Sequence, residues 1–93
     1  MTHAQALSLL PATLVIHAHR VGMKWGEHEA ELWLDQRPEA ISLPAWTMGT
    51  YAGSLSHVPE TLIDAYETAL DCAARDAFEH YDVADYLRRN PCR

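Results

Sequence analysis

His17 and His19 are the residues whose type and spacing point most directly to chemistry. They lie two residues apart in a segment with strand character, and alternate residues of a strand project to the same side of a sheet. Imidazole nitrogens are common zinc ligands, so the pair favours a metal site if a third ligand is near. The candidates for that ligand are His28, His57, His80, Glu27 and Glu29. The other interpretation is that both rings lie on a partly exposed sheet face and bind no metal.

The sequence contains no other recognisable catalytic arrangement. It has neither a Gly-x-Ser-x-Gly motif around a nucleophile nor a His-Glu-x-x-His metal motif. Its four glycines are not grouped as in a phosphate-binding loop. We therefore expect a protein that is not an enzyme and that carries no cofactor.

Length and composition predict a single domain over residues 1–93, of which 48% are hydrophobic and 22% charged. The formal net charge is −6, and eight of the 13 acidic residues lie between residues 59 and 89, against three arginines. Proteins that bind nucleic acid present basic surfaces to the phosphates. Direct binding to nucleic acid or to an anionic membrane is therefore disfavoured.

Two cysteines, Cys72 and Cys92, lack the spacing of a disulfide framework or a zinc site, so free thiols are predicted. The apolar stretch 6–16 contains Pro11, follows a segment without Lys or Arg, and is too short to span a bilayer as a helix. A cytoplasmic location is the main expectation, with a secretory signal as the alternative.

The N-terminal half is predicted to contain a short helix followed by strands. Thr2 and Gln5 have the spacing of a capping box, which predicts a helix over residues 3–10 that ends before Pro11. Alternating apolar and β-branched residues then predict antiparallel strands within 13–43, with Gly26-Glu27 as a two-residue type II′ turn. The alternation shifts near His19, which indicates either a bulge or a strand buried on both faces.

The C-terminal half is predicted to contain an ordered loop and a long helix. Residues 44–58 are rich in Gly, Ser, Thr and Pro and include aromatic residues that would pack the loop, with Trp46 filling the core beneath it. Helical spacing of apolar residues predicts one amphipathic helix over 59–89, with a kink near Asp82 as the alternative. His80 falls on its apolar side and is expected to be buried. The predicted fold is thus α+β: about three antiparallel strands packed by this long helix.

Two surfaces are candidates for binding a partner. One is the outer face of the long helix, which carries the acidic residues Glu60, Asp64, Glu67 and Asp71. Such a row either serves only to solvate the helix or steers a basic partner toward it. The other is the predicted hairpin tip with Met23, Lys24 and Trp25, because tryptophan is enriched at binding hot spots. The remaining alternative for Trp25 is packing on the long helix or on a second copy of the chain.

Small size, local acidity, an aromatic residue at a turn and the absence of a catalytic motif give one leading hypothesis. In general character the chain resembles the small inhibitory proteins of phages and mobile elements, such as anti-CRISPR proteins, although no motif supports that resemblance. It implies a stoichiometric inhibitor or regulator that masks a basic or mixed surface of a host protein. The alternatives are a metal-binding protein or metal-dependent enzyme using His17 and His19, and a structural homodimer.

Overall fold

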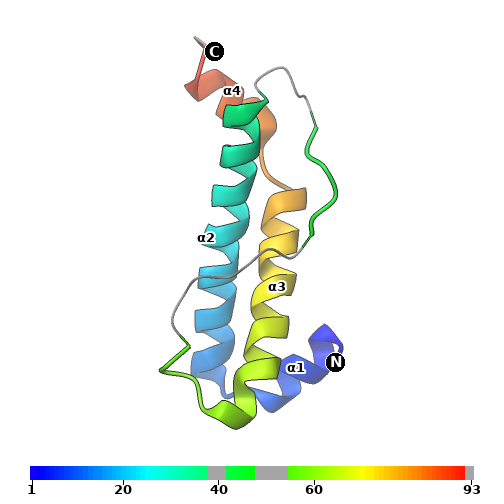
Figure 1. Cartoon of the computed structure of the whole chain (residues 1–93), viewed down its shortest axis with the longest axis vertical. Coiled ribbons are helices and arrows are strands. Elements are labelled where there is room, and N and C mark those ends of the chain that lie inside the picture. Colours follow the sequence, from blue (N-terminus) through cyan, green and yellow to red (C-terminus); the bar gives the residue numbers. More distant parts are fainter. Residues whose placement is uncertain (38–41, 48–54, 92–93) are drawn as a thin grey trace.

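The computed structural model describes residues 1–37, 42–47 and 55–91, and every regular element among them is helical (Figure 1). The elements in order are α1 (His3–Leu9), α2 (Ala12–Gln36), the 3-10 turn η1 (Glu60–Leu62), α3 (Ile63–Glu79) and α4 (Val83–Arg89). Helices α2 and α3 lie side by side and run in the same direction, with α1 against the first half of α3 and α4 at the far end. The chain between α2 and α3 must therefore return along the pair before α3 begins.

The predicted α+β fold is wrong, because the described residues contain no strand and residues 12–36 form one continuous helix. Part of the expected third strand, residues 38–41, lies outside the described residues. Strand propensity of Val, Ile, Thr and Trp is weak and depends on context. Here it is overridden by a second pattern in the same residues, a small or apolar side chain at every fourth position.

That pattern forms the seam between the two long helices. Residues spaced by four lie on one face of a helix, and all five members of this series are buried: Ala18, Gly22, Gly26, Ala30 and Leu34. A Cβ atom on Gly22 would lie 2.5 Å from the carbonyl oxygen of Leu70, and one on Gly26 would lie 2.2 Å from that of Ala74. The helix backbones approach too closely for any side chain at either position.

The predicted type II′ turn at Gly26-Glu27 is therefore also wrong. Gly26 lies in the interior of α2, where it costs about 1 kcal/mol of helix propensity relative to alanine. Close contact with Ala74 and Ala77 of α3 compensates through dispersion between tightly packed atoms. Two glycines four residues apart favour this kind of close helix approach, and that spacing was the sequence signal for the correct fold.

The predicted capping box at the N-terminus is confirmed. The backbone N–H of Thr2 donates to Gln5 Oε1 at 2.7 Å, and the N–H of Gln5 donates to Thr2 Oγ1 at 3.1 Å. Ala6 and Leu10 are buried in the core, and α1 packs on α3. Pro11 is the N-cap residue of α2, where its missing N–H costs no helix hydrogen bond.

The single helix predicted over 59–89 is interrupted in the structure, as in the alternative with a kink near Asp82. Helix α3 ends at Glu79, and Asp82 caps α4 by accepting a hydrogen bond from the N–H of Asp85 at 2.9 Å. The Tyr86 hydroxyl donates to Asp35, which ties α4 to the end of α2. His80, predicted to be buried, is instead exposed because the helix ends there.

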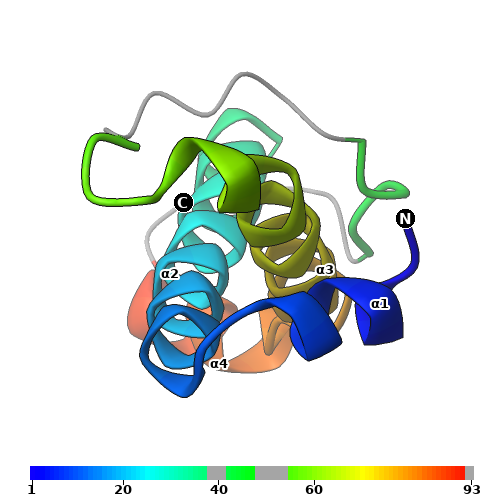
Figure 2. The ribbon, with the colours of Figure 1, turned by 90° about the horizontal axis from the view of Figure 1, so that it is seen from below.

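The connection between α2 and α3 covers one side of the helix pair. We call its described residues 42–47 and 55–59 the return segment. In the view from below, residues 55–59 and α1 lie on opposite sides of the helix pair, and residues 42–47 lie beside α3 (Figure 2). Val58 is buried in the core, and Leu55 packs against it. Residues 48–54 of the loop predicted over 44–58 lie outside the described residues. No helix in the described part of the chain is both long and apolar enough to cross a membrane.

Candidate functional site

The side under the return segment, which we call the covered face, is held by an aromatic cluster. Trp46 meets Trp25 edge-on at 5.7 Å between ring centroids and packs on Phe78 at 5.2 Å. Its indole Nε1 donates to Asp71 at 3.0 Å, while Trp25 Nε1 donates to Glu29 at 3.2 Å. Trp25 is therefore half-buried on α2 and does not project from a hairpin tip. Trp46 covers the helix pair much as the sequence predicted.

A second group on the covered face joins two histidines and a tyrosine. The side chain of Tyr66 is fully buried, and its hydroxyl lies 2.7 Å from His17 Nδ1. His57 Nε2, from the return segment, lies 3.2 Å from the same nitrogen. Nδ1 of His17 thus lies within hydrogen-bond distance of both groups, and the tautomers of the two imidazole rings determine which of them donates. The group is a polar tie that holds the return segment to α2 and α3.

The helix separates the two histidines that the strand prediction had paired. Residues two apart on a helix differ by about 200° in direction, so His17 and His19 project to different sides. His17 meets His57, one of the proposed additional ligands, whereas His19 lines a groove on the other side of the pair. Within the described residues no three His, Cys, Asp or Glu side chains form a group suited to a metal ion. The geometric basis for a His17–His19 site is therefore lost.

The acidic row divides into two kinds of residue. Asp71 accepts hydrogen bonds from Trp46 and from Arg75 at 3.3 Å, and its side chain is only 17% exposed. Glu60 and Asp64 are exposed, Glu67 is half-buried, and none of the three forms an ion pair with a described residue. We call Glu60, Asp64 and Glu67 the acidic face. Asp71 belongs to the packing of the return segment and not to this face.

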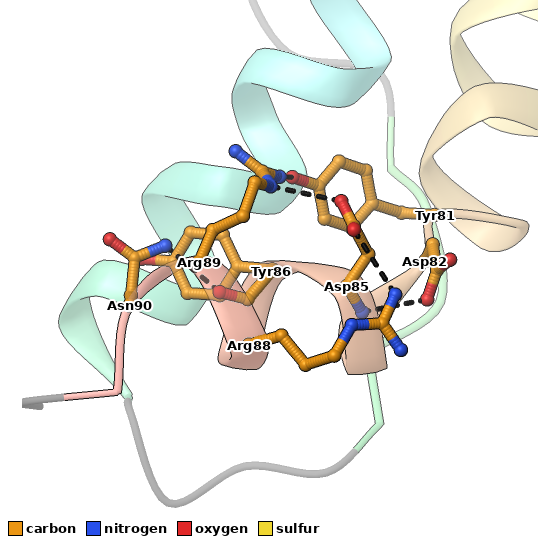
Figure 3. A network of polar contacts seen from close by, with 7 residues as sticks. All are labelled: Tyr81, Asp82, Asp85, Tyr86, Arg88, Arg89 and Asn90. Atoms are coloured by element: carbon orange, nitrogen blue, oxygen red, sulfur yellow. Dashed lines mark hydrogen bonds and ion pairs between the residues drawn. The ribbon is translucent and has the colours of Figure 1, made fainter.

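Most acids farther along the chain have partners within the chain. Asp76 lies 3.1 Å from His80 Nδ1. Figure 3 shows Asp85 bonded to Arg88 at 3.1 Å and to Arg89 at 2.9 Å. Hydrogen bonds from Arg89 and then from Arg88 lower the pKa of the Asp85 carboxyl. Burial raises the pKa of Tyr81, although the hydrogen bond from Arg89 opposes this. The charges of α4 are thus largely compensated, in contrast to the acidic face.

The side of the helix pair away from the return segment, which we call the open face, carries a groove of about 470 Å³ between α1, α2 and α3. Its apolar lining includes Leu7, 37% exposed, and Ile16, 51% exposed. A second groove of about 410 Å³ continues toward α4 and is lined by Met23, which is 38% exposed, and by Glu27. Asp76 lines both grooves, so they adjoin.

The open face was not predicted from the sequence, because residues 13–43 were assigned to strands. Ile16 and Met23 are seven residues apart, which places them on one side of a helix but on opposite sides of a strand. Met23 was expected at the binding surface as part of a hairpin tip, and it is exposed on this helix face instead. Lys24, next to it, is also exposed.

Comparison with protein-family models, with curated proteins and with solved structures found no match for the chain.

Proposed function

We propose that the chain is a non-enzymatic protein-binding module whose acidic face, Glu60, Asp64 and Glu67, docks on a basic or mixed surface of another protein. The observation that carries this proposal is that three acids at helical spacing, in η1 and at the start of α3, lack a cationic partner within the described part of the chain. The neighbouring acid Asp71 and the α4 acid Asp85 are bonded to arginines of the chain, whereas the three acids of the acidic face have no cation within ion-pair distance among the described residues.

Unpaired carboxylates on one side of a small protein of net charge −6 generate a negative potential there. Such a potential accelerates encounter with a basic partner, and the effect weakens as salt shortens the Debye length, which is about 8 Å at physiological ionic strength. A stoichiometric inhibitor or regulator, of the kind that phages and mobile elements direct against host proteins, works by masking such a basic surface. This remains the function we propose.

The test is to reverse the charge of the acidic face and leave Asp71 intact. The triple variant E60K/D64K/E67K changes the formal net charge from −6 to 0, since each replacement adds two positive charges. Reversing Asp71 as well would break its bonds to Trp46 and Arg75 and confuse a folding defect with a binding defect. Affinity capture with the natural protein, followed by mass spectrometry, identifies the partner, and titration then measures its affinity for each variant.

We expect the triple variant to lose partner binding while keeping its helical circular dichroism. The matched control is D64K against E79K, because both acids are exposed on α3 and neither is ion-paired to a described residue. D64K should weaken binding at least about tenfold, and E79K much less. Binding that survives the triple reversal, or that E79K weakens as much as D64K, contradicts the proposal.

A further inference from the structure

The open face carries exposed apolar side chains along one line of α2. Ile16 and Met23 lie on the same side of this helix, next to Leu7 of α1, and together they border the two adjoining grooves. The covered face shows that this chain buries the other side of the same helix pair under its own return segment. No described segment covers the open face in the same way.

The charges along this side of α2 change sign between Lys24 and Glu27, directly after Met23. Arg20 lies on the α1 side of Met23, Lys24 lies next to Met23, and Glu27 and Glu31 lie farther toward α4. Arg20, Lys24 and Glu27 form no ion pair with any described residue, although Lys24 and Glu27 are one helical turn apart. The helix therefore presents an apolar centre with a basic half on one side and an acidic half on the other.

This arrangement is complementary to itself when one copy is turned by 180°. In an isologous dimer both copies use the same surface, so a residue i that contacts residue j of the other copy is matched by j contacting i. The basic half of each copy therefore contacts the acidic half of the other. With the two α2 helices antiparallel and crossing at Met23, Arg20 of each copy lies opposite Glu27 of the other. Ile16 then extends the apolar contact on both sides of the centre.

We infer that the open face is the interface of a homodimer in which α2 packs antiparallel on α2 of a second copy, with Met23 at the centre and Arg20 paired with Glu27 across the interface. The result is a bundle of four long helices, two from each copy, a common way for helices to bury an apolar side. This inference is independent of the proposed function, because neither Asp64 nor Glu67 lines the grooves of the open face.

The first test compares Met23 with Leu32, which lies on α2 away from these grooves and has the same exposed fraction of 38%. Light scattering or sedimentation of the purified chain should give a mass of twice 10.5 kDa at high concentration. M23E should weaken association at least about tenfold, whereas L32E, which introduces the same charge on the same helix, should not. A protein that stays monomeric at all concentrations, or dimers equally affected by both variants, overturns the inference.

The second test exchanges the proposed charge pair and needs only purified protein. R20E and E27R should each weaken self-association, because each places like charges opposite one another. An equimolar mixture of the two variants should associate again, since every Glu then faces an Arg, and the double variant R20E/E27R should form dimers as the natural chain does. A folding defect would not be repaired by mixing. If neither the mixture nor the double variant regains association, Arg20 and Glu27 are not paired and the antiparallel arrangement is wrong.

Discussion

The covered and open faces of the α2–α3 pair use similar apolar residues but differ in how these residues are held. On the covered face Trp46 touches Trp25 and Phe78, and its indole nitrogen is bonded to Asp71. On the open face the side chains of Ile16 and Met23 line the grooves and are 51% and 38% exposed. One face is thus completed by the chain itself, whereas the other is available to a second molecule.

Polar contacts sharpen the same contrast. The covered face joins residues far apart in the sequence, such as His17 with Tyr66 and His57, which fixes an irregular segment in one position. On the open face the charges of Arg20 and Glu27 have no such partners among the described residues. Removing a side chain should therefore affect folding on the first face and association on the second.

The largest loss of stability is expected from a change in the close contact between α2 and α3 at Gly22 and Gly26, because this contact holds together the helix pair that forms both faces. A Cβ at Gly26 would lie 2.2 Å from the Ala74 carbonyl oxygen, which is backbone and cannot rotate away. We expect G26A to lower the free energy of unfolding by about 3 kcal/mol, because forced separation of packed helices outweighs the gain in helix propensity. Urea denaturation followed by circular dichroism measures this.

The control is H28A on the exposed surface of the same helix, which should change stability by less than about 0.5 kcal/mol. A G26A protein as stable as the natural one would mean that the helices do not approach as closely as the seam requires. In that case the covered and open faces would not both depend on close packing of α2 against α3.

A smaller effect distinguishes the faces directly. W46A removes a half-buried ring and leaves Asp71 without its indole donor, so we expect a loss of about 2 kcal/mol in the free energy of unfolding. I16A, on the open face, should cost less than about 0.5 kcal/mol when measured in dilute solution. Equal losses in the two variants would remove the distinction between the covered and open faces.

The smallest effect is a local dependence of α4 on pH. The pKa of Asp85 is lowered by its arginine partners from an ordinary value of 3.8, so the folded state binds this proton less readily than the unfolded state does. The stabilisation of the folded state by the ionised Asp85 carboxylate is therefore complete above pH 3.8. It is lost as the pH falls through the lower pKa of Asp85 in the folded state. The protection of the α4 backbone amides from exchange, relative to an unstructured peptide at the same pH, should fall in that range before the α2–α3 pair unfolds.

The control is D85N, which removes this carboxyl group and should lower the protection of the α4 amides at neutral pH and leave that protection nearly constant across this range. An unchanged pH response in D85N would assign the titration to another group.

Features that depend on neighbours in the sequence were predicted from the sequence alone. The capping box of Thr2 and Gln5, the end of the first helix before Pro11 and the concentration of acids after residue 59 are of this kind. Each depends on backbone groups within one helical turn or on composition, and no distant residue is needed to produce it.

The tertiary structure decided the rest, because residues 12–36 satisfy two periodicities at once. Read with period two they resemble strands, and read with period four they place Gly22 and Gly26 on one side of a helix. Only contact with Leu70 and Ala74, about fifty residues away in the sequence, favours the second reading. The acidic row was divided in the same way, since Trp46 and Arg75 engage Asp71 while Asp64 remains exposed. Packing energy between distant segments outweighs local strand propensity, and that energy cannot be read from either segment alone.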